Sequence, residues 1–135
     1  MDCIFCKIIE GELPSYKIYE DKRIISFLDI NPINKGHLLV MPKEHHRNLA
    51  DTPADLLKEL IDKVQKLSRA LTEAVGVKGF NVMVNNGKVA GQMVEHIHFH
   101  IIPRFENDNL HPWPGKTLSG EEMARTAENI KKLIG

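Results

Sequence analysis

A chain of 135 residues has the length of one domain and is long enough to bury a hydrophobic core without disulfide bonds. Hydrophobic residues make up 42% and charged residues 27% of it, as in ordinary soluble globular proteins. Its 18 basic residues balance its 18 acidic residues, which excludes a broad field that would attract nucleic acid or an anionic membrane. Any phosphate must therefore be bound locally, by a few placed groups.

The sequence contains no apolar run long enough to span a bilayer, and its first residues lack the basic-then-apolar plan of a signal peptide. We therefore expect a cytoplasmic protein that binds neither membranes nor nucleic acid. In that reducing setting the two cysteines, Cys3 and Cys6, favour a metal or redox role over a structural disulfide.

The first part of the chain predicts strands over 17–20, 24–28 and 37–41. Glu20-Asp21-Lys22 is expected to form a turn between the first two strands. Residues 31–36 contain Pro, Asn and Gly and predict a loop before the third strand.

A long amphipathic helix is expected next. Thr52 is the expected N-cap, with Pro53 at the first helical position, and Gly76 is the expected end. Apolar residues recur between them at helical spacing and predict a stripe that faces the core or a dimer interface. This stripe consists of Leu56, Leu57, Leu60, Ile61, Val64, Leu67, Leu71 and Val75.

Two further strands are expected over 80–84 and 94–102, joined by a glycine-bearing loop. Residues 104–118 predict an irregular tail. Ser119 and Glu122 match a capping box at the start of a final helix. The apolar positions of that helix are Met123, Ala127, Ile130 and Ile134.

The order of these elements predicts an α+β fold. We expect a single domain over residues 1–135, with an antiparallel sheet of about five strands, one long helix and a short C-terminal helix. The tail and the C-terminal helix occupy residues 104–135 of that domain.

The segment from His96 to Ile101 alternates between histidine and apolar residues. On a strand this alternation places His96, His98 and His100 on one open face, about 7 Å apart pairwise, and the apolar residues in the core. Three charged imidazoles would repel one another, so at least one is expected to be neutral near pH 7. A neutral imidazole is suited to attack on phosphorus.

No Ser or Cys lies within residues 85–102, so a histidine would itself be the nucleophile. An N-phosphoryl imidazole is reactive enough for water to cleave it afterwards. The loop from Asn85 to Gln92 offers amide and backbone N–H donors for a phosphate. The alternatives are a solvent-exposed strand face or a metal site, but three histidines in register after Gly-Gln and before Ile-Ile-Pro-Arg are more specific than either.

Residues 81–104 closely resemble the signature of the histidine-triad (HIT) family. The similarity runs from Asn81-Val-Met-Val-Asn-Asn-Gly through Gly91-Gln92 to His96-Ile-His-Phe-His-Ile-Ile-Pro-Arg104. It extends to residues 4–9, 27–30 and 36–43, and so covers most of residues 3–104 in the order of the family.

The resemblance implies a nucleotide-binding α+β domain, usually a two-fold dimer, that acts on nucleoside phosphoramidates, nucleotidyl anhydrides or dinucleoside polyphosphates. His98 matches the nucleophile of the family, which becomes nucleotidylated and is then released by water. His100 matches the histidine that contacts the phosphate, and His96 the one that helps to set the site. His37 matches the histidine that supports the triad.

The resemblance also implies nucleotide-binding positions. Asp29 matches the carboxylate that accepts from the ribose hydroxyls, and Asn85, Gly91 and Gln92 match neighbours of the phosphate. Where the family commonly carries Ser or Thr, this chain has Met93, which offers only its backbone N–H and its bulk and leaves the favoured leaving group open. The positions that match the apolar base pocket are Ile4, Phe5, Ile8, Phe27, Ile30 and Leu39.

The two cysteines stand at the start of the chain, not between a strand and a helix as in a thioredoxin-like motif. With His45 and His96 they make the two-thiolate, two-imidazole set that structural zinc favours. Bacterial-type members of the resembled family bind zinc at matching positions, which implies a zinc ion that ties the N-terminus to the histidine segment and holds His96 neutral. His46 is expected to be a solvated loop residue and is the alternative ligand.

Some further residues have two interpretations. Lys43, Arg47 and Arg104 either steer an anionic substrate or are only solvated. Trp113, with His111, lies in a Pro-rich segment that either covers the pocket of a partner subunit or packs on its own domain.

The leading hypothesis is an enzyme that cleaves a P–N or P–O bond at the α-phosphate of a purine nucleotide through a nucleotidyl intermediate on His98. In the Hint-like branch, which the N-terminal and Asp29 regions favour, the substrate is a phosphoramidate. In the fragile-histidine-triad branch, which His-Ile-Ile-Pro-Arg favours, it is a dinucleoside polyphosphate. A non-catalytic nucleotide-binding protein is a third hypothesis. Neutral charge and the long gap between Cys6 and His45 disfavour a zinc-ribbon nucleic-acid module.

Overall fold

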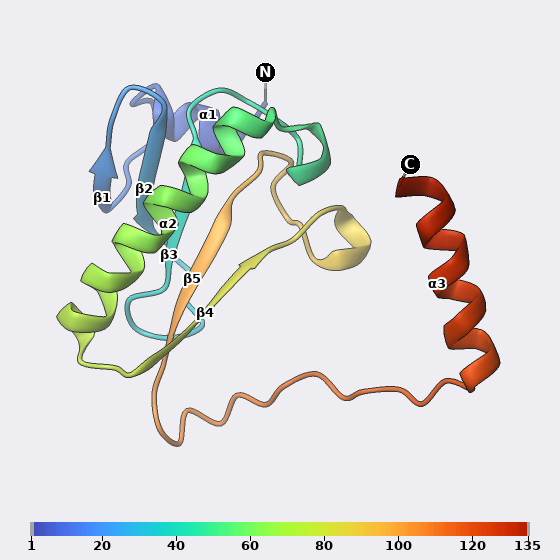
Figure 1. Ribbon diagram of the computed structural model, residues 1–135. Coiled ribbons are helices and arrows are strands. Elements are labelled where there is room, and N and C mark those ends of the chain that lie inside the picture. The colour runs from blue at the N-terminus through green and yellow to red at the C-terminus, as the bar shows by residue number, and fades with distance from the viewer. Residues whose placement is uncertain (1, 135) are drawn as a thin grey trace.

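The computed structural model describes residues 2–134 of the chain. One antiparallel sheet of five strands, in the order β1-β2-β3-β5-β4, lies at its centre (Figure 1). The strands are β1 (Lys17–Glu20), β2 (Ile24–Leu28), β3 (Leu38–Pro42), β4 (Gly79–Val84) and β5 (Phe99–Arg104). The helices are α1 (Ile4–Ile9), α2 (Ala54–Val75) and α3 (Gly120–Ile134), with 3-10 turns η1 (Leu49–Asp51) and η2 (Lys88–Ala90). The α+β class and the five antiparallel strands are confirmed.

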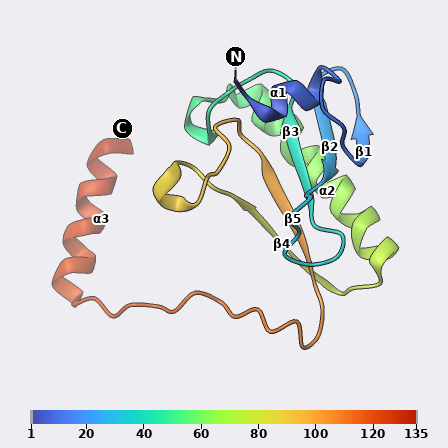
Figure 2. The same cartoon turned by 180° about the vertical axis from the view of Figure 1, so that it is seen from behind.

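Helices cover both faces of the central strands, which explains why consecutive residues of β2 and β3 are buried and the strands do not alternate between buried and exposed positions. On one face α2 packs its buried stripe against the sheet. On the other face lies α1, which Figure 2 shows in front of β2 and β3. The first core includes Val40, Leu56, Leu60, Val64, Ile97, Phe99 and Ile101. The second includes Cys3, Phe5, Ile25, Phe27, Leu39 and Met41.

The long helix α2 ends as predicted but begins differently. Gly76 caps it in the left-handed conformation with φ 72°, which glycine adopts without steric cost. The prediction that Thr52 is the N-cap is wrong, because the residue at that position is Pro53. Thr52 instead closes the turn η1, where its hydroxyl donates to the carbonyl of Asn48 at 2.7 Å. The hydroxyl therefore bonds backward along the chain, away from the helix.

The predicted strand over 94–102 is wrong in its first half, because β5 begins only at Phe99. Phe99 is the first residue of β5 to pair with its neighbours, and it lies opposite Val40 of β3 and Val84 of β4. Before that point the Ile97 N–H leaves the ladder and donates to the carbonyl of His46 at 2.8 Å. His96 and His98 therefore lie in an irregular segment that leads into the strand.

The sequence interpretation missed the helix α1, which has only six residues. Its N-cap is Cys3, whose sulfur accepts from the N–H of Cys6 at 3.4 Å. Cysteine is not among the common N-cap residues, and one and a half turns show no clear helical period. The helix depends on tertiary contacts, chiefly those of the buried Phe5.

The tail and the helix α3 that follows it form a C-terminal arm. The arm begins where Arg104 pairs with Asp108, with Nε of Arg104 2.8 Å from the carboxylate. It continues without helix or strand to Ser119, whose hydroxyl accepts from the N–H of Glu122 at 3.1 Å, as the predicted cap requires. α3 then stands apart from the sheet, and none of its described residues is buried (Figures 1 and 2). Within residues 2–134, no helix combines the length and apolar character needed to cross a membrane.

Candidate functional site

A cavity of about 560 Å³ lies on the face of the sheet that α1 covers. Its floor follows from strand register, because Phe27 lies opposite Leu39 and Leu39 lies opposite His100, and opposed residues share one face of a sheet. The structure brings together all six residues expected to form an apolar pocket: Ile4, Phe5, Ile8, Phe27, Ile30 and Leu39. It adds the expected polar and loop residues Asp29, Gly91, Met93, His98 and His100.

Several lining residues were missed by the sequence interpretation. The connection from α1 to β1 supplies half of them, and Gly11 and Pro14 were the local signals of a loop there. These residues are Leu13, Pro14, Ser15, Leu28, Asn31 and Val94.

His98 is held with one ring nitrogen free. Its Nδ1 lies 2.8 Å from the carbonyl oxygen of His96, and since a carbonyl only accepts, Nδ1 donates and Nε2 carries the lone pair. The edge of the Phe5 ring packs against this imidazole, with the ring centroids 4.9 Å apart. Burial lowers the pKa of His98 from its ordinary value of 6.5, so the ring is neutral at pH 7.

The three histidines lie on one side of the segment, as predicted, because Ile97, Phe99 and Ile101 belong to the core under α2. The prediction that this side is open is wrong. His96 is 0% exposed and His98 is 7% exposed, so both rings lie inside the protein. The helix α1 accounts for this burial, because the edge of its Phe5 ring packs against both imidazoles, with ring centroids 6.0 Å from His96 and 4.9 Å from His98. The expected neutrality of the histidines holds, but burial is its main cause.

The imidazoles of His37 and His100 form a hydrogen-bonded relay. The Ile33 N–H donates to Nδ1 of His37 at 3.0 Å, so His37 carries its proton on Nε2. That nitrogen lies 2.9 Å from Nδ1 of His100 and donates to it. His100 therefore carries its own proton on Nε2, which is buried and has no acceptor among the described residues.

This unpaired N–H is the chemical feature that the relay creates. Burial lowers the pKa of His100 to about 4, and it also lowers the pKa of His37, so both rings remain neutral donors near pH 7. A buried donor without an acceptor costs about 1–3 kcal/mol. Because His100 lines the cavity, an anionic oxygen bound there would satisfy the donor.

The third ring, His96, faces a group of metal-binding side chains. Its Nε2 lies 2.8 Å from the carbonyl oxygen of Pro42 and donates to it, which leaves the Nδ1 lone pair free. Nδ1 lies 3.5 Å from the sulfur of Cys3, 3.6 Å from that of Cys6 and 3.1 Å from Nδ1 of His45. All four donor atoms lie within 4.8 Å of one another.

These distances fit a tetrahedral zinc ion. With Zn–S of about 2.3 Å and Zn–N of about 2.0 Å, sulfur and nitrogen ligands lie about 3.5 Å apart and two nitrogen ligands about 3.3 Å apart. Without a cation, burial raises the pKa of the Cys6 thiol to about 11 and lowers that of His96 to about 4. A zinc ion would bind the thiolate and the neutral imidazole that these groups can offer.

The alternative ligand His46 is directed elsewhere, since its Nε2 lies 2.7 Å from the Glu44 carboxylate. Asp29, His37 and His100 also bring three donor atoms within 4.8 Å of one another. In that group His37 uses Nδ1 to accept from Ile33, so its Nε2 carries a proton and offers no lone pair to a metal. The cysteine-containing group is the better metal site.

The structure places Gln92 and Asn85 outside the cavity lining. The Gln92 side chain is buried, and its oxygen accepts from the Gly87 N–H at 2.8 Å. Its amide donates to the carbonyls of Arg47 and Val94 at 2.7 and 3.0 Å. Gln92 therefore supports the loop that borders the cavity, and its side chain has no free donor for a phosphate.

The cations considered for steering are all engaged in ion pairs. Lys43 binds Glu20 at 2.7 Å, Arg47 binds Asp51 at 2.9 Å, and the Arg104–Asp108 pair anchors the arm. Trp113 is 89% exposed, so its ring does not pack on its own domain.

Comparison with known proteins gives consistent matches. A family model described as the HIT domain matches residues 10–107. The adenosine 5'-monophosphoramidase of Candida albicans is 40% identical over 138 residues, which cover 98% of this chain and 91% of that protein. The crystal structure of a HIT family member from Bacillus subtilis has a TM-score of 0.90 and 39% identity, covering 100% of this chain and 99% of that chain. A zinc-bound histidine-triad family protein from Mycobacterium smegmatis has a TM-score of 0.78 and 39% identity, covering 93% and 89% of the two chains.

The support role of Gln92 leads to a prediction about stability. Gln92→Leu keeps the side-chain volume but leaves three backbone groups without their partner, so we expect the free energy of unfolding to fall by about 1–3 kcal/mol. Denaturant unfolding measures this change. Lys88→Ala, at an exposed position of the same loop, is the control and should stay within about 0.5 kcal/mol of the parent protein. Equal stabilities of the two variants would contradict the assigned role.

Proposed function

The chain belongs to the histidine-triad (HIT) family, and on that premise we propose that it is a nucleotide hydrolase or transferase acting at the α-phosphate of purine nucleoside phosphoramidates or nucleotidyl anhydrides. The relative named an adenosine 5'-monophosphoramidase supports this reaction class. The observation that carries the proposal is the pair of tautomers at the cavity wall. His98 offers a neutral lone pair on Nε2, and His100 offers an N–H that lacks an acceptor.

The proposed reaction has two displacements. Nε2 of His98 forms a bond to the α-phosphorus, the bond from phosphorus to the leaving group breaks, and the leaving group takes up a proton from water. Water then attacks the phosphorus and releases His98 and a nucleoside monophosphate. The N–H of His100 donates to a phosphate oxygen in both steps, and stabilises charge that grows in the transition state.

The nucleoside would occupy the apolar side of the cavity. Phe5, Phe27 and Leu39 present a wall suited to a purine ring. Asp29 accepts the Asn31 N–H on Oδ1 at 2.8 Å, and its Oδ2, which lies 3.6 Å from Nε2 of His37, would accept from ribose hydroxyls.

The charge of the cavity favours a phosphoramidate over a dinucleoside polyphosphate. Of the described residues that line it, none is Lys or Arg, and Asp29 adds a negative charge. A polyphosphate leaving group carries several negative charges that would need cations nearby. An amine leaving group carries no negative charge, so the neutral histidines are sufficient for it.

Replacement of the nucleophile separates an enzyme from a non-catalytic nucleotide-binding protein. We expect His98→Asn to lower the hydrolysis of adenosine phosphoramidate by about a thousandfold or more while AMP still binds. Mass analysis of parent protein quenched during turnover should find a nucleotide on the peptide that contains His98. His46→Asn, which alters an imidazole outside the cavity, is the control. Turnover that survives in His98→Asn would refute the assignment.

We propose that Cys3, Cys6, His45 and His96 hold a structural zinc ion. The zinc-bound relative and the tetrahedral spacing of the donor atoms support this. A bound ion would fix the ring of His96, whose carbonyl orients His98. Thiolate ligands persist under reducing conditions, which is consistent with the proposed cytoplasmic location.

Elemental analysis tests the metal assignment. Unchelated protein should contain about one zinc ion per chain, and Cys6→Ser should lose most of it and melt at a lower temperature. His46→Asn should retain the metal, because that ring pairs with Glu44. Zinc well below one ion per chain in the parent protein would contradict the proposal.

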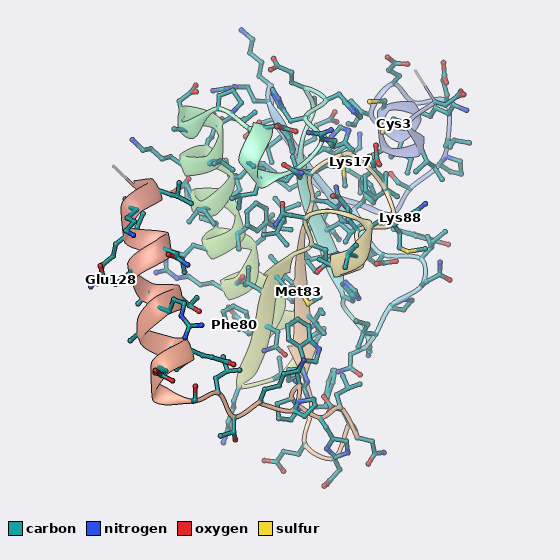
Figure 3. All side chains as sticks on the ribbon, turned by 90° about the vertical axis from the view of Figure 1, so that its right-hand side faces the viewer. Cys3, Lys17, Phe80, Met83, Lys88 and Glu128 are labelled. Atoms are coloured by element: carbon teal, nitrogen blue, oxygen red, sulfur yellow. The ribbon has the colours of Figure 1, made fainter. Side chains whose placement is uncertain are left out.

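We also propose that the protein is a homodimer formed through the β4 edge of the sheet. β4 has an unpaired side, and the exposed Phe80, Val82 and Ile61 form an apolar surface beside it. Figure 3 labels Phe80 on β4 and Glu128 on α3. A second copy would cover the apolar surface and give the arm a protein surface to bind.

Sedimentation equilibrium tests this assembly. We expect the mass of two chains for the parent protein and a shift toward one chain for Phe80→Glu, which places a charge in the apolar surface. Tyr16→Glu changes an exposed aromatic residue outside that surface and should leave the dimer intact. A parent protein with the mass of one chain at micromolar concentration would contradict the proposal.

A further inference from the structure

The turn from Ile33 to His37 makes two hydrogen bonds with its own histidine. The Ile33 N–H donates to Nδ1 of His37 at 3.0 Å, and the backbone N–H of His37 donates to the carbonyl of Asn34 at 3.1 Å. The first bond decides which ring nitrogen of His37 carries the proton, and the second keeps the turn closed. The shape of this turn therefore controls the hydrogen bond that His37 donates to His100.

The two rings of this relay can carry their protons in two arrangements. In the arrangement that the Ile33 N–H selects, both protons are on Nε2, and His100 offers an N–H. In the reverse arrangement both protons are on Nδ1, His100 donates to His37, and Nε2 of His100 offers a lone pair that would repel a phosphate oxygen. The reverse arrangement is disfavoured because Nδ1–H of His37 would face the N–H of Ile33, a contact between two donors.

Asp29 acts on the same proton through the other ring nitrogen of His37. Its Oδ2 lies 3.6 Å from Nε2 of His37, which favours a proton there but is longer than a good hydrogen bond. The Ile33 N–H lies closer to its own ring nitrogen and makes a hydrogen bond with it. The turn is therefore the more direct determinant of the proton arrangement, with a smaller contribution from the carboxylate.

The side chain of Asn34 fastens this turn to the end of β5 and to the start of the C-terminal arm. Its amide donates to the carbonyl of Pro103 at 2.9 Å and to Oδ2 of Asp108 at 3.0 Å. The Asp108 side chain is 8% exposed, and its carboxylate also accepts from Nε and Nη2 of Arg104 at 2.8 and 3.0 Å. Asn34 is thus bound to two groups that are themselves held in place.

We propose that Asn34 is a positioning residue for the reaction, which keeps the proton of His100 on Nε2. The inference rests on the proposed function, because this donor matters where a phosphate is bound. Asn34 does not line the cavity, so it acts through the turn and through His37. Asp108 holds the Asn34 amide, so the first residues of the arm contribute to the geometry of the donor.

Nitrogen NMR of protein labelled in its histidine rings reads the proton positions without relying on activity. In the parent protein near pH 7, His37 and His100 should both be protonated on Nε2. In Asn34→Ala we expect a measurable fraction of both rings to be protonated on Nδ1. Lys35→Ala truncates an exposed side chain of the same loop and is the control, which should match the parent protein.

Turnover of adenosine phosphoramidate gives the second readout. We expect kcat to fall about tenfold in Asn34→Ala, less than the roughly hundredfold that loss of a whole donor costs, because Asp29 still favours the original arrangement. KM should change by less than about threefold, since the base pocket and the nucleophile are untouched. Asn34→Ser keeps a hydroxyl donor and should lie between Asn34→Ala and the parent protein in both readouts. It replaces Asn34→Ala if circular dichroism shows that the alanine variant is unfolded.

The outcomes separate this inference from the function on which it rests. Unchanged ring protonation in the variant overturns the inference whatever the rate does, because a residue that only stabilises the loop would give that result. Altered protonation with an unchanged kcat also overturns it, because the His100 donor would then not act in the reaction. A parent protein that does not hydrolyse adenosine phosphoramidate overturns the proposed function and, with it, this inference.

Discussion

The hydrogen bond from the His98 ring to the carbonyl of His96 is the constraint on which the site depends. It places the free lone pair of His98 on Nε2, and it lies in the irregular segment directly before β5 begins. The ring of His96 is held in turn by the carbonyl of Pro42 and by the sulfur atoms beside it. The contacts of the metal-binding group therefore orient His96, and the carbonyl of His96 orients the ring of His98, the proposed nucleophile.

Burial then gives these rings their chemistry. Isolated from water, the imidazoles near the cavity stay neutral, so that one can act as a nucleophile and another as a donor. The loop that carries His37 can reach its place because Gly36 adopts φ +91° close to α2, where an added Cβ would lie 3.1 Å from the side chains of Leu71 and Val75. A backbone that only glycine tolerates therefore supports the donor His100.

Elements with a clear hydrophobic period could be predicted from the sequence, and elements set by tertiary contacts could not. β1, β2 and the end of α2 match their predicted bounds. The start of β5 depends on where its neighbours stop pairing, which a sequence does not state. The cavity residues were anticipated through the family resemblance. The same resemblance placed Gln92 beside the phosphate, since a sequence does not show that the Gln92 amide donates to the carbonyl of Arg47.

The sulfur of Cys3 has two roles. It accepts the N–H of Cys6 and so caps α1, and it is one of the four proposed zinc ligands. The short helix has little intrinsic stability, and its Phe5 forms part of the cavity wall. A zinc ion bound as proposed would therefore add a ligand bond to the residue that caps this helix, so the metal site and the cavity wall would gain stability together.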